Sequence, residues 1–428
     1  MSAHASPATP TAEPAELRPV QLAWLAAAVF VVSAGYGALL PLLPAWLISI
    51  MPGTTATEVA RHVGFLSGVY AAGALLGALL WGVVSDRVGP GRILILGLVG
   101  YVASLLLLLV PSWGGLGGIY VLRGSTGFSV AAVVPVVSAL VAEHTPDGQR
   151  ARRFAWLSAM SLLGFLFGPA LSAAADWIRS GAVEAAVSGA ASARSVIVLS
   201  ALLGAVIMLG LARTLPAPRV SVQAVENDPV TSARGHSVAL LCVNGALMFV
   251  LAGFELGVLL QGQQHSSLSS RQVAMMFAEC SLVMLGINAL LFFTELLKKV
   301  SARALMAAGL LLAMAGLIGL AQHRSQAWLY LGVSLTAAGM GLGLPVVAYL
   351  AAGASRRKLG ATMGGLAAAA GLGQALGSSV AGWFFGVMGQ HTFAWLTLPL
   401  VTLLVLLLAR PGWWLVSASP STLLPSRQ

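Results

Sequence analysis

The chain has 428 residues, of which 58% are hydrophobic and 8% are charged. A soluble domain carries about 25% charged residues, so this composition excludes a water-soluble globular protein. The formal net charge is +10, from 23 Lys and Arg residues against 13 Asp and Glu residues. The chain has only two cysteines, Cys242 and Cys280, and both lie in apolar segments, which excludes a disulfide framework and a cysteine-based metal site.

Apolar segments long enough to cross a bilayer follow one another along the chain. A helix needs about 20 apolar residues to cross a hydrocarbon core about 30 Å thick. The first segment starts at Gln21 and is too long for the core of a signal peptide, so we expect it to remain a membrane helix. The predicted fold class is an all-α membrane protein of twelve transmembrane helices. The spans lie near residues 22–50, 64–84, 93–110, 117–143, 153–175, 195–212, 238–261, 272–295, 303–321, 327–352, 360–389 and 392–410.

The distribution of basic residues predicts the orientation of these spans. Twelve crossings place both termini on one side of the membrane. If that side is the cytoplasm, 17 of the 23 Lys and Arg residues lie in inside segments. This bias follows the positive-inside rule, so we expect a protein of the bacterial inner membrane with both termini in the cytoplasm. The basic charge is then a topology signal, and no nucleic-acid partner is expected.

A polar connection at the middle of the chain divides the spans into two groups of six. Residues 213–236 contain three prolines and a short acidic and polar cluster, which is typical of a linker. We predict a disordered cytoplasmic tail over 1–20, an N-terminal six-helix bundle over 21–212 and a cytoplasmic linker over 213–236. A second six-helix bundle follows over 237–411, and a cytoplasmic tail over 412–428.

The two groups of spans show signs of an internal repeat. Pro135-Val136-Val137 in the fourth span recurs as Pro345-Val346-Val347 in the tenth. Gly168 in the fifth span corresponds, at nearly the same offset, to Gly377 in the eleventh. Parallel repeats of six helices are a transporter architecture in which the substrate site lies near the midplane between the halves.

The loop after the second span carries the most specific motif of the chain. It reads Gly82-Val-Val-Ser-Asp86-Arg87-Val-Gly89-Pro-Gly-Arg92. This run resembles the signature loop between helices 2 and 3 of the major facilitator superfamily. The resemblance implies two pseudo-symmetric six-helix bundles and a gating role for the loop, with Asp86 holding one conformational state. The equivalent loop of the second half, 293–303, lacks the Gly and the Asp.

Three further motifs favour the twelve-helix drug:proton antiporter group of that superfamily. The run from Tyr36 to Pro44 is similar to the proline-rich first helix of this group. Leu122-Arg123-Gly124 resembles a fourth-helix motif whose Arg is associated with proton transfer. Gly164-x3-Gly168-Pro169 resembles the fifth-helix motif of exporters, although Ala155 stands in place of its first Gly. These resemblances favour export.

Few ionisable groups lie within the predicted spans. Arg123, Glu255 and Glu279 are our candidates for proton coupling. A charge at the centre of a membrane helix costs about 2.5–3.5 kcal/mol on insertion scales, so such a group is expected to face a cavity or a partner. Glu255 is the deepest of the carboxyl groups, and its alternative role is a neutral acid bonded to a backbone carbonyl. The sequence leaves open which carboxylate pairs with Arg123.

Other side chains within the spans are candidates for the wall of a substrate cavity. They are Tyr36, Phe128, Phe254, Asn288, Tyr349 and Gln374. For the aromatic members of this set, contact with lipid or with the protein core is an equally good interpretation.

Together these patterns predict a secondary transporter, with proton-coupled export of a drug or metabolite as the leading hypothesis. One alternative is an importer or uniporter in which Glu255 binds a substrate amine. Another is a receptor or scaffold with an inactive transporter fold. The chain has no nucleotide-binding loop and no zinc-protease motif, so an enzyme is not expected. We expect no cofactor or metal. The expected partners are a small-molecule substrate, protons and the lipid bilayer, bound by a monomer.

The charge bias leads to a first testable prediction. A reporter fused after Gln428 and one inserted near Asn227 should both give a cytoplasmic signal, because basic loops resist translocation. Paired alkaline phosphatase and fluorescent protein fusions measure this. A periplasmic signal from either position would overturn the topology.

Overall fold

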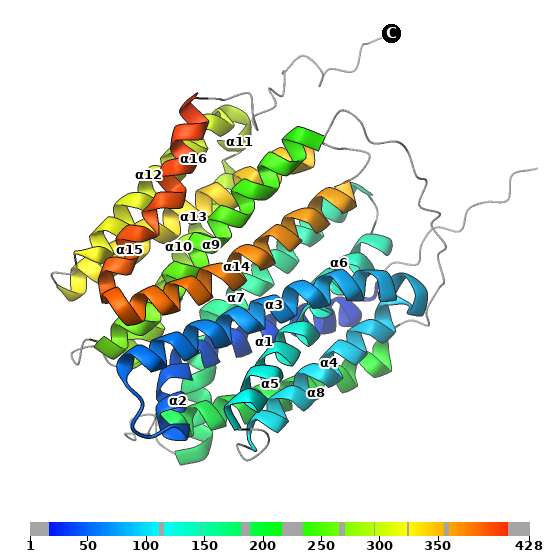
Figure 1. Ribbon diagram of the computed structural model, residues 1–428. Coiled ribbons are helices and arrows are strands. Elements are labelled where there is room, and N and C mark those ends of the chain that lie inside the picture. The colour runs from blue at the N-terminus through cyan, green and yellow to red at the C-terminus, as the bar shows by residue number, and fades with distance from the viewer. Residues whose placement is uncertain are drawn as a thin grey trace, which may run out of the picture.

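A computed structural model describes residues 17–110, 115–145, 147–180, 189–215, 234–264, 270–294, 296–322, 325–354 and 359–409. These residues form a bundle of long helices, with no β-strand among them (Figure 1). This confirms the predicted all-α class. Most of the predicted tails and of the 213–236 linker lie outside the described residues.

The first half of the chain supplies the helices up to residue 214. They are α1 (Pro19–Leu39), η1 (Leu40–Leu42), α2 (Leu43–Ile50), α3 (Ala56–Val88), α4 (Pro90–Leu108), α5 (Gly115–Val130), α6 (Val133–Glu143), α7 (Asp147–Ser180) and α8 (Gly189–Thr214).

The second half begins at Arg234, within the last three residues of the predicted linker. Its helices are α9 (Arg234–Gln264), α10 (Ser270–Phe293), α11 (Leu296–Lys299), α12 (Ala302–Ala321), α13 (Gln326–Ala354), α14 (Leu359–Met388), η2 (Gly389–His391), α15 (Thr392–Trp395) and α16 (Thr397–Ala409).

Ten segments of the described chain are long and apolar enough to cross a membrane. Twelve are predicted from the sequence, and the difference lies in two places. One of the ten, Gly365–Ala409, contains both α14 and α16, and the chain turns back between them at η2 (Figure 1). Helix α7 is not among the ten, although it is 34 residues long and packs against α1. The chain is therefore an integral membrane protein.

Prolines decide where the helices of the first half break. The first span is interrupted at η1, next to Pro41, and α2 restarts with Pro44 in its first turn. The fourth span breaks at residues 131–132, between α5 and α6, just before Pro135. Proline has no backbone N–H to continue the helical ladder, so a break near it is expected. Its counterpart in the repeat, Pro345, lies inside the continuous helix α13.

Local signals also fix both ends of α3. Thr55 and Glu58 form a capping box, in which the Thr55 hydroxyl accepts from the Glu58 N–H and the Glu58 carboxylate accepts from the Thr55 N–H. The helix therefore begins before the predicted residue 64. At the other end Gly89 has φ of 96°, a left-handed conformation that favours glycine. Pro90 then occupies the first turn of α4.

Helix packing within each half depends on close backbone contacts. In the first half, α1 lies against α7 and α3 against α5. In the second half, α9 lies against α14 and α12 against α13. A Cβ atom at Gly377 of α14 would overlap the Phe249 carbonyl oxygen of α9. Small residues allow such approach in membrane helices, where dispersion between closely packed atoms is a main source of association energy.

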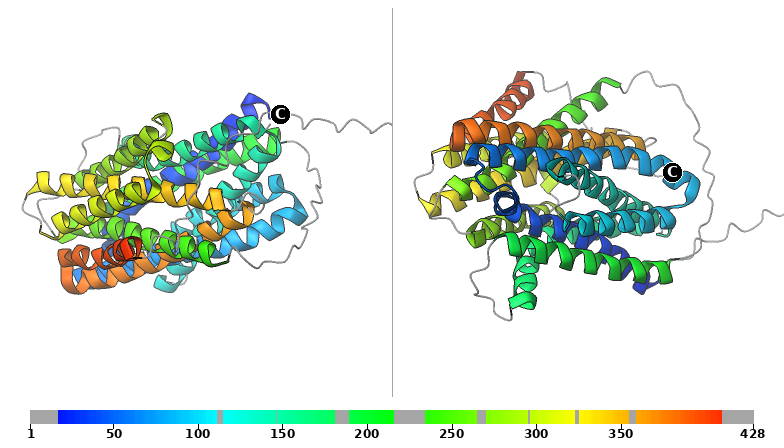
Figure 2. Two further views of the ribbon diagram at one scale, coloured as in Figure 1. Left: turned by 90° about the horizontal axis from the view of Figure 1, so that it is seen from above. Right: turned by 60° about the horizontal axis from the view of Figure 1, so that its bottom comes forward.

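The two halves meet mainly along α3 and α14, which run side by side (Figures 1 and 2). The Thr57 hydroxyl donates to the Gly386 carbonyl over 2.9 Å. A Cβ atom at Gly64 would lie 2.7 Å from the Gly382 Cα. Both contacts lie near the start of α3 and the end of α14. We call this the far end, because it is opposite the end where α1 begins and α16 stops, which we call the near end.

The contact at Gly64 generates a second prediction. In Gly64→Ala the new methyl group would lie 2.7 Å from Gly382 and 2.9 Å from the Ser378 carbonyl oxygen, so α3 and α14 must separate. Such overpacking costs about 1–3 kcal/mol. We therefore expect a lower midpoint of thermal unfolding for the purified protein in detergent.

Gly286→Ala is the matched control, because a Cβ atom there meets nothing within 4 Å. Replacing a helical glycine in open space stabilises by about 0.5–1 kcal/mol, so its midpoint should be equal or higher. A Gly64→Ala protein as stable as Gly286→Ala would show that the halves are not packed in this way.

Candidate functional site

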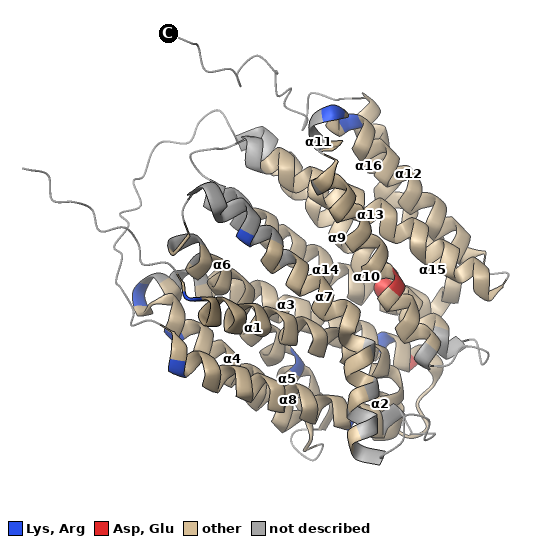
Figure 3. Cartoon of the chain, turned by 180° about the vertical axis from the view of Figure 1, so that it is seen from behind, with Lys and Arg blue, Asp and Glu red and all other residues tan. Residues whose placement is uncertain are grey.

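Charged side chains are sparse along the described helices. Figure 3 shows that Lys and Arg gather at the near end, around α11 and the turn between α3 and α4. Arg123 of α5 is an exception to this distribution, since its side chain is buried with an exposed fraction of 3%. A guanidinium inside an apolar bundle needs compensation, which makes its surroundings the natural place to look for a site.

Two tyrosine rings compensate part of that charge. The Arg123 Cζ lies 4.6 Å from the ring centroid of Tyr70 on α3 and 5.8 Å from that of Tyr36 on α1. The two rings stack on each other, with centroids 4.9 Å apart and an interplanar angle of 28°. A cation within about 6 Å of an aromatic face is attracted by the ring quadrupole. Arg123, Tyr36 and Tyr70 thus form one cluster, which we call the central cluster.

Glycines of α5 position this arginine. A Cβ atom at Gly127 would overlap the Tyr70 carbonyl oxygen, and one at Gly73 of α3 would overlap the Gly124 carbonyl oxygen. Because neither glycine has a side chain, α5 lies directly on α3. The close approach brings the arginine, one position before Gly124, onto the Tyr70 ring.

Part of the guanidinium has no hydrogen-bond partner. The Arg123 Nε and Nη2 atoms are buried and make no hydrogen bond, and no salt bridge to Arg123 is found among the described residues. The sequence leaves the choice of a carboxylate partner open, and the described part of the chain supplies none. The Tyr36 and Tyr70 rings thus contact the guanidinium with their faces, while its Nε and Nη2 atoms have no hydrogen-bond acceptor.

A chain of aromatic rings leads from this cluster into the second half. The Phe165 ring of α7 lies 6.0 Å from the Tyr36 ring, and 6.1 Å from the Phe277 ring of α10. Phe277 is buried. The rings of Tyr36, Phe165 and Phe277 therefore connect α1, α7 and α10 across the boundary between the halves.

Glu255 of α9 faces the same region from the second half. It is half-buried and lies close enough to Tyr36 and to Cys280 to act electrostatically on both. The groups that act on Arg123 in this way are Tyr70, Tyr36 and Tyr101, and Glu255 is not among them. The structure thus brings three of the candidate residues, Arg123, Tyr36 and Glu255, to one central region.

Glu279 of α10 has a different environment. One of its carboxylate oxygens accepts a hydrogen bond from the Ser334 hydroxyl of α13, and the other is buried without a partner. The side chain is half-buried and also lies close to Cys280. Its hydrogen bond joins α10 to α13 within the second half.

The remaining cavity candidates are not brought into the central cluster. Phe254 is buried in the core, Asn288 donates to the Met284 carbonyl of its own helix over 2.8 Å, and Tyr349 is exposed. The Phe128 carbonyl accepts from the Trp81 indole over 2.7 Å, and the two rings pack together. Gln374 is half-buried on α14.

Tyr70 and Phe165 are not among the residues predicted from the sequence. An aromatic residue in an apolar span carries no local pattern that separates a core position from one beside a buried charge. The glycines at positions 68 and 73, on either side of Tyr70, are the one available signal, because they indicate that α3 is closely approached there.

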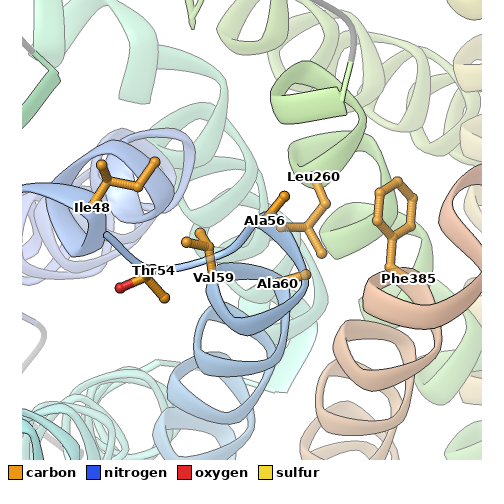
Figure 4. A pocket seen from close by; sticks show the side chains of 7 residues that line it. All are labelled: Ile48, Thr54, Ala56, Val59, Ala60, Leu260 and Phe385. Carbon is orange, nitrogen blue, oxygen red and sulfur yellow. The ribbon is translucent and has the colours of Figure 1, made fainter. Parts of the chain in front are cut away.

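A small cavity lies at the far end, between the two halves. Its volume is about 180 Å³, and Figure 4 shows side chains of both halves around it. Its lining residues are Ile48, Thr54, Ala56, Val59 and Ala60 from the first half and Leu260 and Phe385 from the second. Six of these seven lining residues are apolar, and Thr54 is the polar one.

The comparison with known families agrees with this arrangement. Residues 25–291 match the family model described as Major Facilitator Superfamily. The chain belongs to the major facilitator superfamily.

Two curated relatives match part of the chain. The tetracycline resistance protein, class B, of Escherichia coli is 33% identical over 135 residues, which is 32% of this chain and 32% of that protein. The quinolone resistance protein NorA of Staphylococcus aureus is 27% identical over 143 residues, which is 33% of this chain and 35% of that protein. The alignments thus span about a third of the length of these relatives. They support a resemblance to superfamily members of the drug-efflux type.

Solved structures show the same fold over nearly the whole chain. The human organic anion transporter MFSD10 has a TM-score of 0.68 and 21% identity, covering 91% of this chain and 100% of that one. A POT family transporter in complex with 5-aminolevulinic acid has a TM-score of 0.74 and 14% identity, covering 92% and 97%. At such identities the likeness concerns the fold alone.

The superfamily loop lies at the near end. Arg87 and Arg92 are exposed there, and Gly89 makes the turn between α3 and α4. The side chain of Asp86 and the surroundings of Gly82 are not described.

The exporter-like motif lies on α7, where it faces α1. A Cβ atom at Gly168 would lie 2.5 Å from the Gly37 carbonyl carbon, and one at Gly164 would overlap the Phe30 carbonyl oxygen. The side chain of Pro169 lies outside the described residues. The two glycines thus allow α7 to pack beside Tyr36 and place Phe165 next to it.

Proposed function

We propose that this protein is a secondary transporter of the bacterial inner membrane that exports a small organic compound in exchange for protons. The observation that carries the proposal is the position of Glu255. This carboxyl group from the second half approaches Tyr36 of the first half, which stacks with Tyr70 beneath Arg123. A titratable group at the boundary between two bundles responds to their movement.

The chemistry of such a carboxyl group suits proton coupling. A low-dielectric environment disfavours the charged form, and entry of water or of a cationic group favours it. When the bundles 21–212 and 237–411 move, water reaches Glu255 from one side and then from the other. The group then takes up a proton on one side of the membrane and releases it on the other.

The packing between the halves supports alternating access. Contacts at Thr57 and Gly64 hold the two halves together at the far end, beside the cavity of Figure 4. If the near end is cytoplasmic, as the charge distribution predicts, the substrate path in this state opens toward the cytoplasm. An exporter loads its substrate in such a state.

We assign the gating role to the superfamily loop at the near end. Asp86, with Gly82, Arg87, Gly89 and Arg92, would hold the near end of the bundle in one state and release it in the other. The opposite conformation must close that end, where the exposed Arg87 and Arg92 lie. The names of the two curated relatives make tetracycline-like and quinolone-like compounds the first substrates to test.

Replacing the proposed coupling group tests this function. Purified protein in liposomes with an imposed pH gradient should move a substrate from a panel of cationic, neutral and anionic drugs. Glu255→Gln keeps the size of the side chain and mimics its protonated form. We expect this variant to insert normally and to lose gradient-driven movement by more than tenfold.

Glu279→Gln is the matched control, because the Gln carbonyl can still accept the hydrogen bond from Ser334. It should retain most of the wild-type rate. Wild-type gradient-driven transport in Glu255→Gln, together with its loss in Glu279→Gln, would move the coupling role to Glu279.

A further inference from the structure

The unpartnered atoms of Arg123 lie on one edge of the guanidinium. Nε–H and Nη2–H point in the same direction from this planar group and form a two-pronged donor. Both atoms are buried without a hydrogen-bond partner, and the side chain is only 3% exposed. A buried charge without hydrogen bonds costs several kcal/mol, so this edge is prepared for an acceptor.

The described part of the chain does not provide that acceptor. Tyr70 and Tyr36 meet the guanidinium with their ring faces, 4.6 and 5.8 Å from Cζ, and so leave its donor edge free. Among the described residues no carboxylate reaches Arg123. A buried donor edge with no acceptor in the described part of the chain is a position at which a ligand can be recognised.

The geometry of the edge selects the chemistry of that group. Two parallel N–H donors match the two oxygens of a carboxylate, which is the bidentate pairing that arginine forms and lysine does not. The rings of Tyr36, Phe165 and Phe277 form an aromatic row with neighbouring centroids about 6 Å apart, and this row starts at the Tyr36 ring, 5.8 Å from the Arg123 Cζ. A flat aromatic body can stack or pack edge-on against such rings.

We propose that Arg123 binds the carboxylate of an aromatic acid and that the transported compounds belong to this class. The proposal rests on the transport function given above, because it concerns the substrate of the same central region. In it the Nε and Nη2 atoms bind the two carboxylate oxygens, and the aromatic part of the compound lies along the rings that lead toward α10.

Binding to the full-length protein in lipid nanodiscs tests this proposal without any pH gradient. The probe is 2-naphthoate at pH 7, compared with 2-naphthamide, which has the same ring and no charge. Isothermal titration calorimetry should show at least tenfold tighter binding of the acid. Equal affinities, or no binding of the acid, would overturn the proposal.

Arg123→Lys and Arg123→Gln separate the donor edge from simple charge attraction. Lysine keeps the positive charge but lacks the two parallel N–H donors, so the preference of the Arg123→Lys protein for naphthoate over naphthamide should be about tenfold lower than that of the wild type. The Arg123→Gln protein should show no preference. An unchanged preference in Arg123→Lys would contradict a bidentate site. If either variant fails to fold, the comparison of acid and amide on the wild-type protein still decides the question.

This experiment can fail independently of the transport experiment. Naphthoate binding that depends on Arg123, in a protein that moves nothing along a pH gradient, would support the carboxylate site and reject proton-coupled transport. Gradient-driven transport of other compounds, in a protein that does not distinguish naphthoate from naphthamide, would reject the carboxylate site alone.

Discussion

Helix α5 lies so close to α3 that a Cβ atom at Gly127 would overlap the Tyr70 carbonyl oxygen. The position of Arg123 depends on this approach, because it brings the guanidinium onto the Tyr70 ring. Similar contacts at Gly168 and Gly377 bring α7 against α1 and α14 against α9. In a membrane, where burial of apolar surface does not drive helices together, such close packing sets the geometry of the bundle. The position of the central cluster thus follows from the glycines that let the backbones of neighbouring helices come into contact.

Within that frame, one cation and one carboxyl group define the centre of the molecule. Arg123 is buried in the first half, Glu255 belongs to the second, and Tyr36 is close to both. Neither group is neutralised by a described partner of opposite charge. Stability alone would favour apolar residues at both positions, because an unpaired ionisable group in a membrane is costly. Their presence is best explained by ligands that bind during transport, a proton at Glu255 and an anionic group at Arg123.

Most of the fold can be predicted from the sequence, because apolar length is a strong signal for a membrane helix. The span predicted at 303–321 is α12 within one residue, and the one at 360–389 is α14 within one residue. The start of α3 is predicted eight residues late, since Arg61 and His62 interrupt the apolar run while the Thr55–Glu58 cap begins the helix earlier. Pro135 and Pro345 show the limit of the repeat, because only the first lies beside a helix break. Whether the helix breaks beside such a proline depends on the packing around it.

The site is only partly predictable. Arg123 and Glu255 stand out as ionisable groups in apolar spans, and Tyr36 as part of a proline-rich first helix. Tyr70 and Phe165 do not, because their role depends on which helices pack together. The free donor edge of Arg123 is likewise invisible in the sequence, since it follows from the direction in which the tyrosine rings approach. Which side chains from distant parts of the sequence lie together can be seen only in the three-dimensional structure.

The most direct measurement of the central claim is transport by a protein whose far end is locked. The Thr57 Cα lies 3.5 Å from the position of a Cβ atom at Gly386, so a Thr57→Cys, Gly386→Cys pair can form a disulfide after Cys242 and Cys280 are replaced by Ala. Alternating access predicts that oxidation abolishes substrate movement in liposomes and that reduction restores it, while oxidation should leave the rate of each single-cysteine variant equal to its own rate under reducing conditions. Equal transport by the cross-linked and the reduced protein would show that the halves need not separate at the far end, and would contradict the account.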